Sequence, residues 1–353
     1  MKISIIGAGN GGQAMAGHFG ILGHKVTLYN RSLYRISNII NTASIELQDG
    51  ICGNGKIDCI TTDISKAVKA ADLIMITTTA DAHAEIACLM APCVEEGQTI
   101  VLNPGRTLGA IEFSNVLRKI TTKRVYIAEA QSLIYACRAE KAGQVKVIGV
   151  KDKVLLAAYP AVDTDYVLNL INCVYPCFIK ANNVLETSLE NIGAIFHPSV
   201  VLFNAATIER GQEFYFYNDM TPAIANFLTK IDQERLTIGI AFGIKLNSVS
   251  EWVSFAYKNI KGDDLCSKMQ NNPAYYKILS PRNLQTRLLY EDVPTGILPL
   301  TELGKMAGVD TPLLTSVLNI SQNLLDVDFV STGRTLRNLG LENISASDFL
   351  KSL

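Results

Sequence analysis

The sequence predicts an α/β domain over residues 1–180, built on a doubly wound parallel sheet, followed by a mostly α-helical domain over residues 181–353. In the first part, short apolar runs alternate with helical stretches, which is typical of strand–helix–strand units. In the second part, apolar residues recur three and four positions apart, which is typical of amphipathic helices. At 353 residues, the chain is long enough to form two hydrophobic cores.

The first strand–helix–strand unit carries a glycine-rich turn. Residues 3–6 predict a buried strand and residues 25–29 a second one, with a helical stretch between them. The turn after the first strand matches G-x-G-x-x-G. Its first glycine permits the tight turn, its second lets a pyrophosphate approach the backbone, and its third lets the helix pack closely. In this context the motif indicates a Rossmann dinucleotide site rather than a turn without a ligand. We therefore expect cofactor contacts from Gly7, Gly9, Asn10, Gly11 and Gly12.

The end of the second strand selects between the two pyridine nucleotides. A site for NAD usually has Asp or Glu there, which binds the ribose 2′-hydroxyl. This chain has Asn30, Arg31 and Ser32 instead. Without a carboxylate a 2′-phosphate is not repelled, and the guanidinium of Arg31 can pair with it. The sequence thus favours NADP over NAD, unless Arg31 is only a solvated loop residue.

Later strands of the predicted sheet end in further candidate contacts. Because the carboxyl ends of parallel strands line the ligand crevice, we expect the residues that follow strands 72–77 and 99–102 to contact the ribose and nicotinamide. Helix packing explains the imidazole at position 83 equally well. The candidates are Thr78, Ala80, His83, Asn103 and Gly105.

The rest of the first domain is less regular. Residues 44–62 predict small strands joined by tight turns, and residues 125–128, 135–138 and 145–150 predict further strands. Residues 154–178 fit either a strand or a helix.

The second domain begins with a helical pattern over residues 185–203 and continues with others over 222–257 and 312–325. Proline removes a helical hydrogen bond and biases the residue before it away from helical angles. We therefore expect a break at His197 and Pro198. From the residues alone, two interpretations of His197 stay equally open: its imidazole faces a ligand, or it is a core histidine at a kink without a function.

Composition excludes several classes of protein. The 32 basic and 33 acidic residues give a net charge of −1, so neither nucleic acid nor an anionic membrane is an expected partner. No stretch approaches 18 uninterrupted apolar residues, so no membrane span is expected. The eight cysteines form no C-x-x-C pair and only four histidines accompany them, so we expect no metal site. Scattered cysteines of this kind predict reduced thiols in a cytoplasmic protein.

The motifs together resemble those of the opine dehydrogenases, the octopine/nopaline dehydrogenase family. The similarity covers essentially the whole chain and includes residues 7–12, 102–105, 129–131, 191–198, 234–235 and 291–294. The resemblance implies a Rossmann domain, a helical domain and an active site in the cleft between them. It also implies reductive condensation, in which an amino acid and an α-keto acid such as pyruvate form an imine that NAD(P)H reduces.

The resemblance also implies roles for individual residues. The family's catalytic histidine maps onto His197 and its partner aspartate onto Asp292, an imidazole and carboxylate pair suited to proton transfer near neutral pH. Arg287 matches an arginine that binds the substrate carboxylate, and Cys137 is expected to border the substrate.

Other functions stay open at this stage. A ketopantoate-type reductase would act on a keto acid without an amine, and a non-catalytic NADP sensor could lose the His197 and Asp292 pair. Within the family, the product could be a small opine or a metallophore. The apolar helices of the second domain allow a homodimer or an internal core.

Overall fold

The computed structural model describes residues 1–257 and 260–353. They divide into two compact units. The first unit comprises Met1–Gly105 and Gly109–Thr187, and the second comprises Arg106–Leu108 and Ser188–Leu353. The domain boundary expected after residue 180 stays a prediction.

The first unit is built on an eight-stranded sheet in the order β12-β11-β8-β7-β6-β1-β2-β5. Neighbouring strands run parallel except for β8 and β11. Six neighbouring strands, β5-β2-β1-β6-β7-β8, have the doubly wound order. The sequence order of the strands changes direction between β1 and β6, although the strands themselves stay parallel. This confirms the predicted parallel sheet. The strands are β1 (Lys2–Ile6), β2 (Lys25–Tyr29), β5 (Cys59–Thr61), β6 (Leu73–Ile76), β7 (Thr99–Leu102), β8 (Tyr126–Ala130), β11 (Val154–Tyr159) and β12 (Phe178–Lys180).

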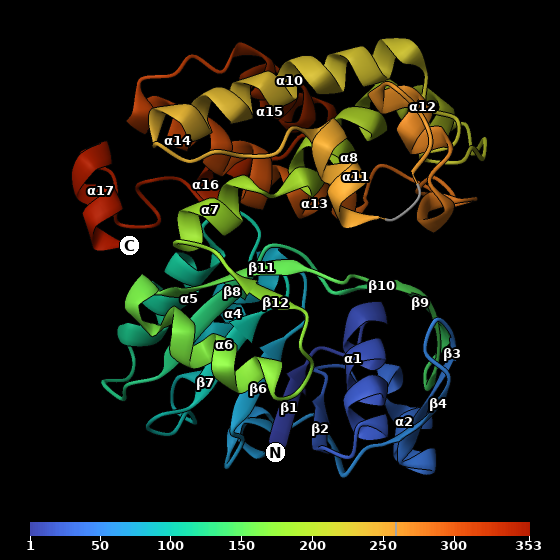
Figure 1. Cartoon of the computed structure of the whole chain (residues 1–353), viewed down its shortest axis with the longest axis vertical. Helices are drawn as coiled ribbons and strands as arrows, with labels where there is room; N and C mark the ends of the chain where they lie inside the picture. Colours follow the sequence, from blue (N-terminus) through green and yellow to red (C-terminus); the bar gives the residue numbers. More distant parts are fainter. Residues whose placement is uncertain (258–259) are drawn as a thin grey trace. The chain divides into compact units, whose positions relative to one another are not determined.

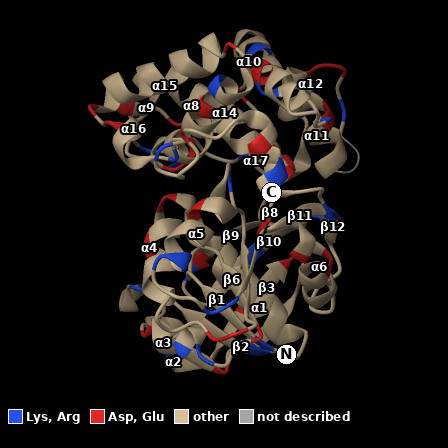
Figure 2. Cartoon of the chain, turned by 90° about the vertical axis from the view of Figure 1, so that its left-hand side faces the viewer, with Lys and Arg blue, Asp and Glu red and all other residues tan. Residues whose placement is uncertain are grey.

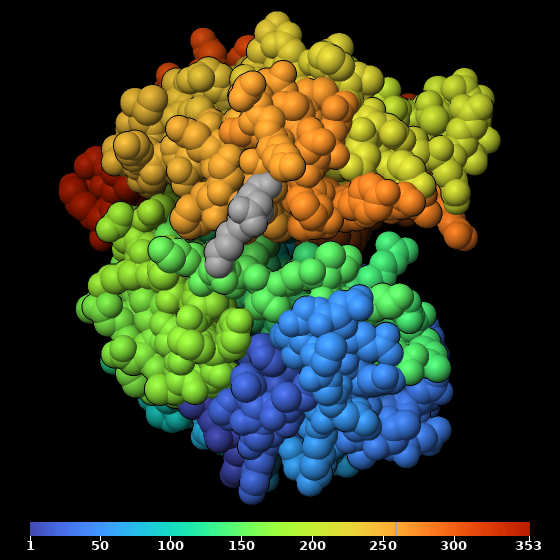
Figure 3. All heavy atoms as spheres, turned by 45° about the vertical axis from the view of Figure 1, so that its right-hand side comes forward, coloured from blue at the N-terminus to red at the C-terminus, as the bar shows by residue number. Residues whose placement is uncertain are grey.

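A second, four-stranded sheet in the order β4-β3-β10-β9 packs against α1 of the first unit (Figure 1). In Figure 3 the light-blue residues of β3 and β4 lie against the green residues of β9 and β10. The strands expected within 135–138 and 145–150 thus exist, although they belong to this sheet. Its strands are β3 (Ser44–Asp49), β4 (Gly53–Lys56), β9 (Tyr135–Lys141) and β10 (Gln144–Val150).

Helices cover both faces of the large sheet. Helices α1 and α6 share one apolar core with the small sheet, and α4 packs against α5. The ambiguous residues 154–178 form β11, α6 and the start of β12. The helices of this unit are α1 (Asn10–Ile21), α2 (Ser37–Thr42), α3 (Ile64–Val68), α4 (His83–Met90), α5 (Gly109–Arg118) and α6 (Thr164–Asn172), with 3₁₀ turns at Leu33–Arg35, Ala80–Ala82 and Ala161–Asp163.

The second unit is helical, as predicted. Helices α10 and α15 run side by side in it (Figure 1). Its helices are α8 (Ile192–Phe203), α9 (Ala205–Glu209), α10 (Pro222–Ala241), α11 (Val249–Ala256), α12 (Leu265–Gln270), α13 (Arg287–Tyr290), α14 (Leu298–Ala307), α15 (Pro312–Leu325), α16 (Phe329–Thr332) and α17 (Ala346–Ser352), with a 3₁₀ turn at Pro273–Tyr275 and a π-helical segment, η5 (Val293–Ile297).

The predicted helix over residues 185–203 and its break at Pro198 are wrong. The pattern comprises two helices, α7 (Val184–Leu189) and α8, which are separated at Glu190 and Asn191. Pro198 lies inside α8, and the helix continues to Phe203. Six residues of α8 precede this proline, so it costs one hydrogen bond of a helix whose apolar side chains are held by packing.

A buried ion pair fixes α10 to its neighbours. Arg235 is fully buried, and its Nε donates to Asp232 Oδ1 at 2.7 Å. Its Nη1 donates to the carbonyl of Leu189 at 2.9 Å, and Nη2 donates to the carbonyl of Asn247. The other oxygen of Asp232 accepts from the Val249 N–H at 2.8 Å. The pair thus satisfies backbone groups at the ends of two other helices.

Replacing Arg235 with methionine is expected to lower the free energy of unfolding by about 3–5 kcal/mol, because Asp232 then stays buried without its counter-ion. Urea unfolding followed by circular dichroism measures this. Arg337 is an exposed arginine of the same unit that pairs with Glu342, so R337M serves as the control and should change stability by at most about 0.5 kcal/mol. Equal losses in both variants would contradict the structural role of Arg235.

Basic and acidic segments are scattered among uncharged ones in each unit (Figure 2). None of the helices within residues 1–257 and 260–353 is long and apolar enough to cross a membrane.

Candidate functional site

The glycine loop joins β1 to α1 and leaves the first turn of α1 open. Gly7 has a φ of +112°, which suits glycine, and a Cβ at Gly12 would collide with the carbonyl oxygen of Gly7. A Cβ at Gly9 would meet no atom within 4 Å, so space is open above the loop. Gly9 caps α1 without a side-chain hydrogen bond. These features fit a pyrophosphate at the helix N-terminus.

The segment Asn30-Arg31-Ser32, which the sequence predicts to favour NADP over NAD, lies beside this loop. Asn30 Oδ1 accepts from the Ala8 N–H at 3.1 Å, and its amide donates to the carbonyl of Ser32 at 3.0 Å. Asn30 therefore ties the glycine loop to the end of β2. Arg31 is 74 % exposed and pairs with Glu85 at 2.8 Å. Its guanidinium is accessible to a ligand, but Glu85 already competes for it.

The structure brings the other cofactor candidates of the first unit to the carboxyl ends of β6 and β7. A Cβ on Gly7 would lie 3.0 Å from the Thr78 side chain, so Thr78 adjoins the glycine loop. The hydroxyl of Thr78 and both amide atoms of Asn103 are buried without a hydrogen-bond partner in the described chain. Such atoms fit a ligand rich in polar groups, as a pyridine nucleotide is.

The remaining candidates of this unit have structural partners. Ala80 and His83 are buried at the start of the α4 region. Gly105 donates its N–H to the carbonyl of Ala130 at 3.1 Å, and Asn10 Oδ1 accepts from the Ala139 N–H at 3.1 Å. Cys137 packs against the apolar core, and burial raises the pKa of its thiol to about 12, so the thiol is protonated at neutral pH. Their contacts with ligands stay predictions.

In the second unit, His197 and Asp292 form a hydrogen-bonded pair. His197 Nδ1 lies 2.7 Å from Asp292 Oδ2, although the residues are 95 positions apart in the sequence. Helix α8 carries the imidazole, and the carboxylate directly precedes η5. A Cβ at Gly296 would lie 2.5 Å from that of Ala194. The absence of a side chain at Gly296 therefore lets η5 approach α8 closely enough to form the pair.

The surroundings of the pair determine its protonation. Burial alone would raise the pKa of Asp292, but the charge of Arg106, together with the charge and hydrogen bond of His197, lowers it to about 2. The carboxylate is therefore ionised at neutral pH and accepts a hydrogen bond from the Nδ1–H, which leaves Nε2 as the nitrogen with the free lone pair in the neutral imidazole. The hydroxyl of Tyr217 lies 3.2 Å from Nε2, and burial raises the pKa of this phenol well above its ordinary value. Tyr217 thus presents a neutral hydroxyl to Nε2.

Aromatic rings surround this face of the imidazole. The ring of Tyr217 stacks on Tyr275 with centroids 4.1 Å apart, and Phe216 approaches His197 edge-on at 6.1 Å. The imidazole itself is 16 % exposed, whereas Asp292 is completely buried. The pair is therefore a base with one accessible edge and a shielded counter-ion, an arrangement suited to acid–base chemistry.

Two guanidinium groups accompany two adjacent carboxylates in this site. Arg106 Nη1 lies 3.3 Å from Asp292 Oδ1, and its Nε donates to Glu291 Oε1 at 3.4 Å. Arg287 Nη1 donates to Glu291 Oε2 at 3.1 Å and is 58 % exposed. The predicted substrate contact Arg287 is thus an accessible cation beside the pair, whereas Arg106 is 12 % exposed.

The sequence interpretation missed Arg106 and Tyr217. Arg106 follows Gly105, a predicted cofactor contact, and its place in that strand-end turn was the only available signal. Within the described residues, no group of three or more His, Cys, Asp or Glu side chains is arranged to hold a metal.

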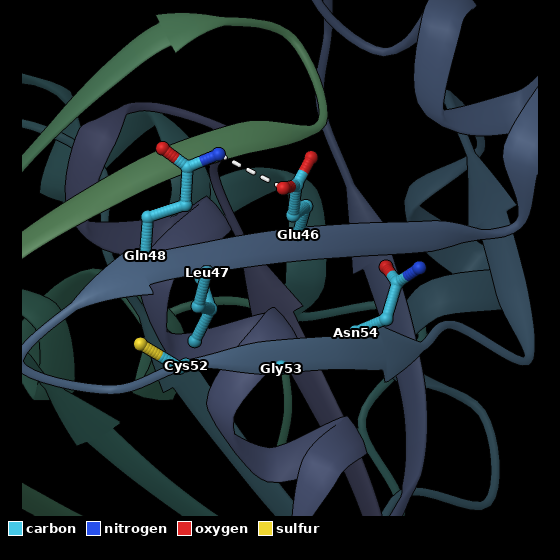
Figure 4. A pocket seen from close by; sticks show the side chains of 6 residues that line it. All are labelled: Glu46, Leu47, Gln48, Cys52, Gly53 and Asn54. Atoms are coloured by element: carbon cyan, nitrogen blue, oxygen red, sulfur yellow. Dashed lines mark hydrogen bonds between the residues drawn. The ribbon is translucent and has the colours of Figure 1, made fainter.

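The small sheet has a hollow on its surface, over β3 and β4. The residues that line it are far in the sequence from His197 and Asp292. Glu46, Leu47, Gln48, Cys52, Gly53 and Asn54 line it (Figure 4). Gln48 donates to Glu46 on the same strand at 2.8 Å, and hydrogen bonds from Gln48 and Gln144 lower the pKa of Glu46. It contains no basic group to complement a phosphate or a carboxylate.

Comparisons with known proteins match both units of the chain to described families. Residues 180–325 match the family model for the α-helical domain of NAD/NADP octopine/nopaline dehydrogenase, and residues 2–120 match that for the N-terminus of NAD-dependent glycerol-3-phosphate dehydrogenase. An opine dehydrogenase of Arthrobacter sp. (strain 1C) is 40 % identical over 346 residues, which cover 98 % of this chain and 96 % of that protein.

Solved structures share the fold. Octopine dehydrogenase in complex with NADH and agmatine superimposes with a TM-score of 0.81 and 21 % identity, over 100 % of this chain and 98 % of that one. Yersinopine dehydrogenase with NADP⁺ bound gives a TM-score of 0.73 and 13 % identity, over 99 % and 98 % of the two chains.

Proposed function

Because this chain belongs to the opine dehydrogenase family, we propose that His197 is its general acid–base and that Asp292 orients and stabilises the imidazole. The chain catalyses NAD(P)H-dependent reductive condensation of an amino acid with an α-keto acid, and the reverse oxidation. The observation that carries the assignment of His197 is its 2.7 Å hydrogen bond to a buried, ionised carboxylate.

The proposed mechanism uses the imidazole twice. Attack of a neutral amine on the keto carbon gives a zwitterion, and His197 Nε2 takes a proton from its nitrogen and returns it to the alkoxide oxygen, which gives the neutral carbinolamine. The imidazole then takes up a proton from solvent and passes it to the hydroxyl, so water departs and the protonated imine forms. Asp292 stabilises the positive charge of the ring between these transfers. The bound pyridine nucleotide supplies the hydride that reduces the imine carbon.

We propose that Arg287 binds a substrate carboxylate. Its guanidinium is 58 % exposed and donates to Glu291 through Nη1, so its other N–H groups are available for a bidentate carboxylate contact. Related solved structures contain L-arginine, agmatine or pyruvate. An amino acid and a small α-keto acid are therefore the proposed substrates, and Cys137 stays a predicted neighbour of the substrate.

We propose that NADP is preferred over NAD. No carboxylate follows β2 in the segment Asn30-Arg31-Ser32, and the exposed guanidinium of Arg31 can exchange Glu85 for a 2′-phosphate. An exposed ion pair of this kind contributes little to stability, so a doubly charged phosphate can displace it.

Replacing Arg31 with aspartate is expected to lower kcat/KM for NADPH by about 10²-fold and to leave that for NADH unchanged or higher, because the new carboxylate repels the 2′-phosphate and can bind a 2′-hydroxyl. Steady-state kinetics with both nucleotides measure the change. E85Q is the matched control, which removes the competing acid and should tighten NADPH binding. An unchanged NADPH/NADH ratio in R31D would refute this role for Arg31.

The reaction itself is tested by NADPH oxidation with pyruvate alone and then with pyruvate plus a panel of amino acids and amines. Oxidation that requires the amine is the expected result. Oxidation with the keto acid alone would favour a ketopantoate-type reductase instead. NADPH binding without turnover, across a wide set of keto acids and amines that includes larger amino-acid conjugates, would favour a sensor.

A further inference from the structure

We propose that Arg106 is a positioning residue for this reaction, which holds Glu291 and Asp292 as adjacent carboxylates and so fixes Asp292 against His197. The inference rests on the proposed roles of His197 and Asp292. Arg106 would then affect the proton transfers through Asp292 and His197, without contacting the substrate itself.

The first argument is the charge in the site. Glu291 and Asp292 are neighbours in sequence, and their side chains are 4 % and 0 % exposed. Two buried carboxylates so close together repel each other unless a cation compensates them. Arg106 meets both, at 3.4 Å and 3.3 Å, and both carboxylates raise the pKa of its guanidinium. Arg287 donates to Glu291 Oε2, and its charge contributes less than that of Arg106 to lowering the pKa of Asp292.

The second argument is the fit of the guanidinium. Its Nη1 also donates to Asn191 Oδ1 at 3.2 Å, directly before α8 begins. A Cβ at Gly193 would lie 2.5 Å from this Nη1 and 3.4 Å from His197 Cε1. A side chain at residue 193 would therefore require the Arg106 guanidinium to move from this position. The arginine contacts the segment that carries the acid and the helix that carries the base.

The third argument distinguishes positioning from substrate binding. Two carboxylates already compensate Arg106, and its side chain is 12 % exposed. A third carboxylate would bind there against the charge of the first two. Arg287, more exposed and in contact with one carboxylate, is the better anion-binding group. Loss of Arg106 should therefore affect kcat more than KM.

The test compares R106Q, R106K and the exposed control R337Q in steady-state kinetics with saturating NADPH. We expect R106Q to lower kcat by about 10²-fold, as part of the contribution of the acid–base group, with KM for either substrate within about threefold. R106K should regain part of this loss because it keeps the charge. R337Q should behave like the parent protein. A tenfold rise in KM with kcat within threefold would overturn the proposal, because Arg106 would then bind substrate.

Two further variants separate charge compensation from general damage. In R106Q/E291Q one buried carboxylate is neutralised, so kcat should recover at least about fivefold over R106Q. No recovery would overturn the proposed compensation. Should R106Q fail to fold, G193A still tests the inference, because its methyl group displaces Arg106 while alanine favours the helix. We expect G193A to fold and to lose at least about tenfold in kcat. A folded G193A with parental kcat would refute the proposal.

Failure of this inference differs from failure of the proposed function. If H197A retains turnover, the assigned acid–base group is wrong whatever Arg106 does. If H197A is inactive but R106Q and G193A retain parental kcat, the acid–base assignment holds and only the role of Arg106 fails.

Discussion

H197A is expected to lower kcat by about 10²–10⁴-fold, the range that a positioned general acid–base contributes. Alanine removes the only group in the pair that can accept and return a proton near neutral pH. Asp292 cannot take over this function, because it is fully buried and its pKa of about 2 makes it a very weak base. The loss should appear in the condensation and in the reverse oxidation alike, since both use the same proton transfers.

The measurement is single-turnover and steady-state NADPH oxidation with the best keto acid and amine pair. NADPH binding, followed by fluorescence, serves as the internal control. It should stay nearly unchanged because the glycine loop belongs to the first unit, whereas His197 belongs to the second. A preformed imine, where one is stable enough to supply, should be reduced with a smaller loss. Turnover near the parental rate in H197A would exclude His197 as the acid–base group.

D292N is expected to be the second most damaging substitution, with a loss of about 10³-fold in kcat. Asparagine has nearly the same shape but lacks the charge that stabilises imidazolium. Its amide can also donate to Nδ1, which would move the proton to Nε2 and leave the basic lone pair facing away from the substrate. Of the two carboxylates that pair with Arg106, D292N would leave only that of Glu291.

The control for D292N is D348N, which neutralises an exposed aspartate of the same unit that pairs with Lys351. D348N should retain parental kinetics. A thermal melt of D292N separates loss of catalysis from loss of structure, and the NADPH-binding assay confirms an intact first unit. A folded D292N with a loss of less than about tenfold would indicate that His197 keeps its orientation and charge without Asp292.

The glycine loop between β1 and α1 could be predicted from the sequence because its signal is local. The turn from Gly7 to Gly12 follows a strand and opens a helix, and the collision that a Cβ at Gly12 would cause with the Gly7 carbonyl is the reason for that glycine. The doubly wound order of the strands follows from the same alternation of apolar runs and helices.

The pairing of His197 with Asp292 could not be derived from spacing. His197 and Asp292 are 95 residues apart, and only the family resemblance connected them before the fold brought them together. Arg106 lies 185 positions from Glu291, so no periodicity could relate the two. The local rule for proline was misleading at Pro198, because the buried apolar face of α8 outweighs one lost hydrogen bond.

The three residues Arg106–Leu108 limit how the two units can be exchanged between relatives. They belong to the helical unit but lie within the chain of the first, between Gly105 and Gly109. The Leu108 N–H donates to Ser188 Oγ at 2.8 Å, and the Thr107 carbonyl accepts from Arg334 at 2.8 Å, so the helical unit holds this tripeptide on several sides. A chimaera joined only at residue 187 would therefore receive the histidine and aspartate of one parent with the arginine of the other. Recombination that preserves the site needs two crossovers, with residues 106–108 inherited together with the C-terminal half.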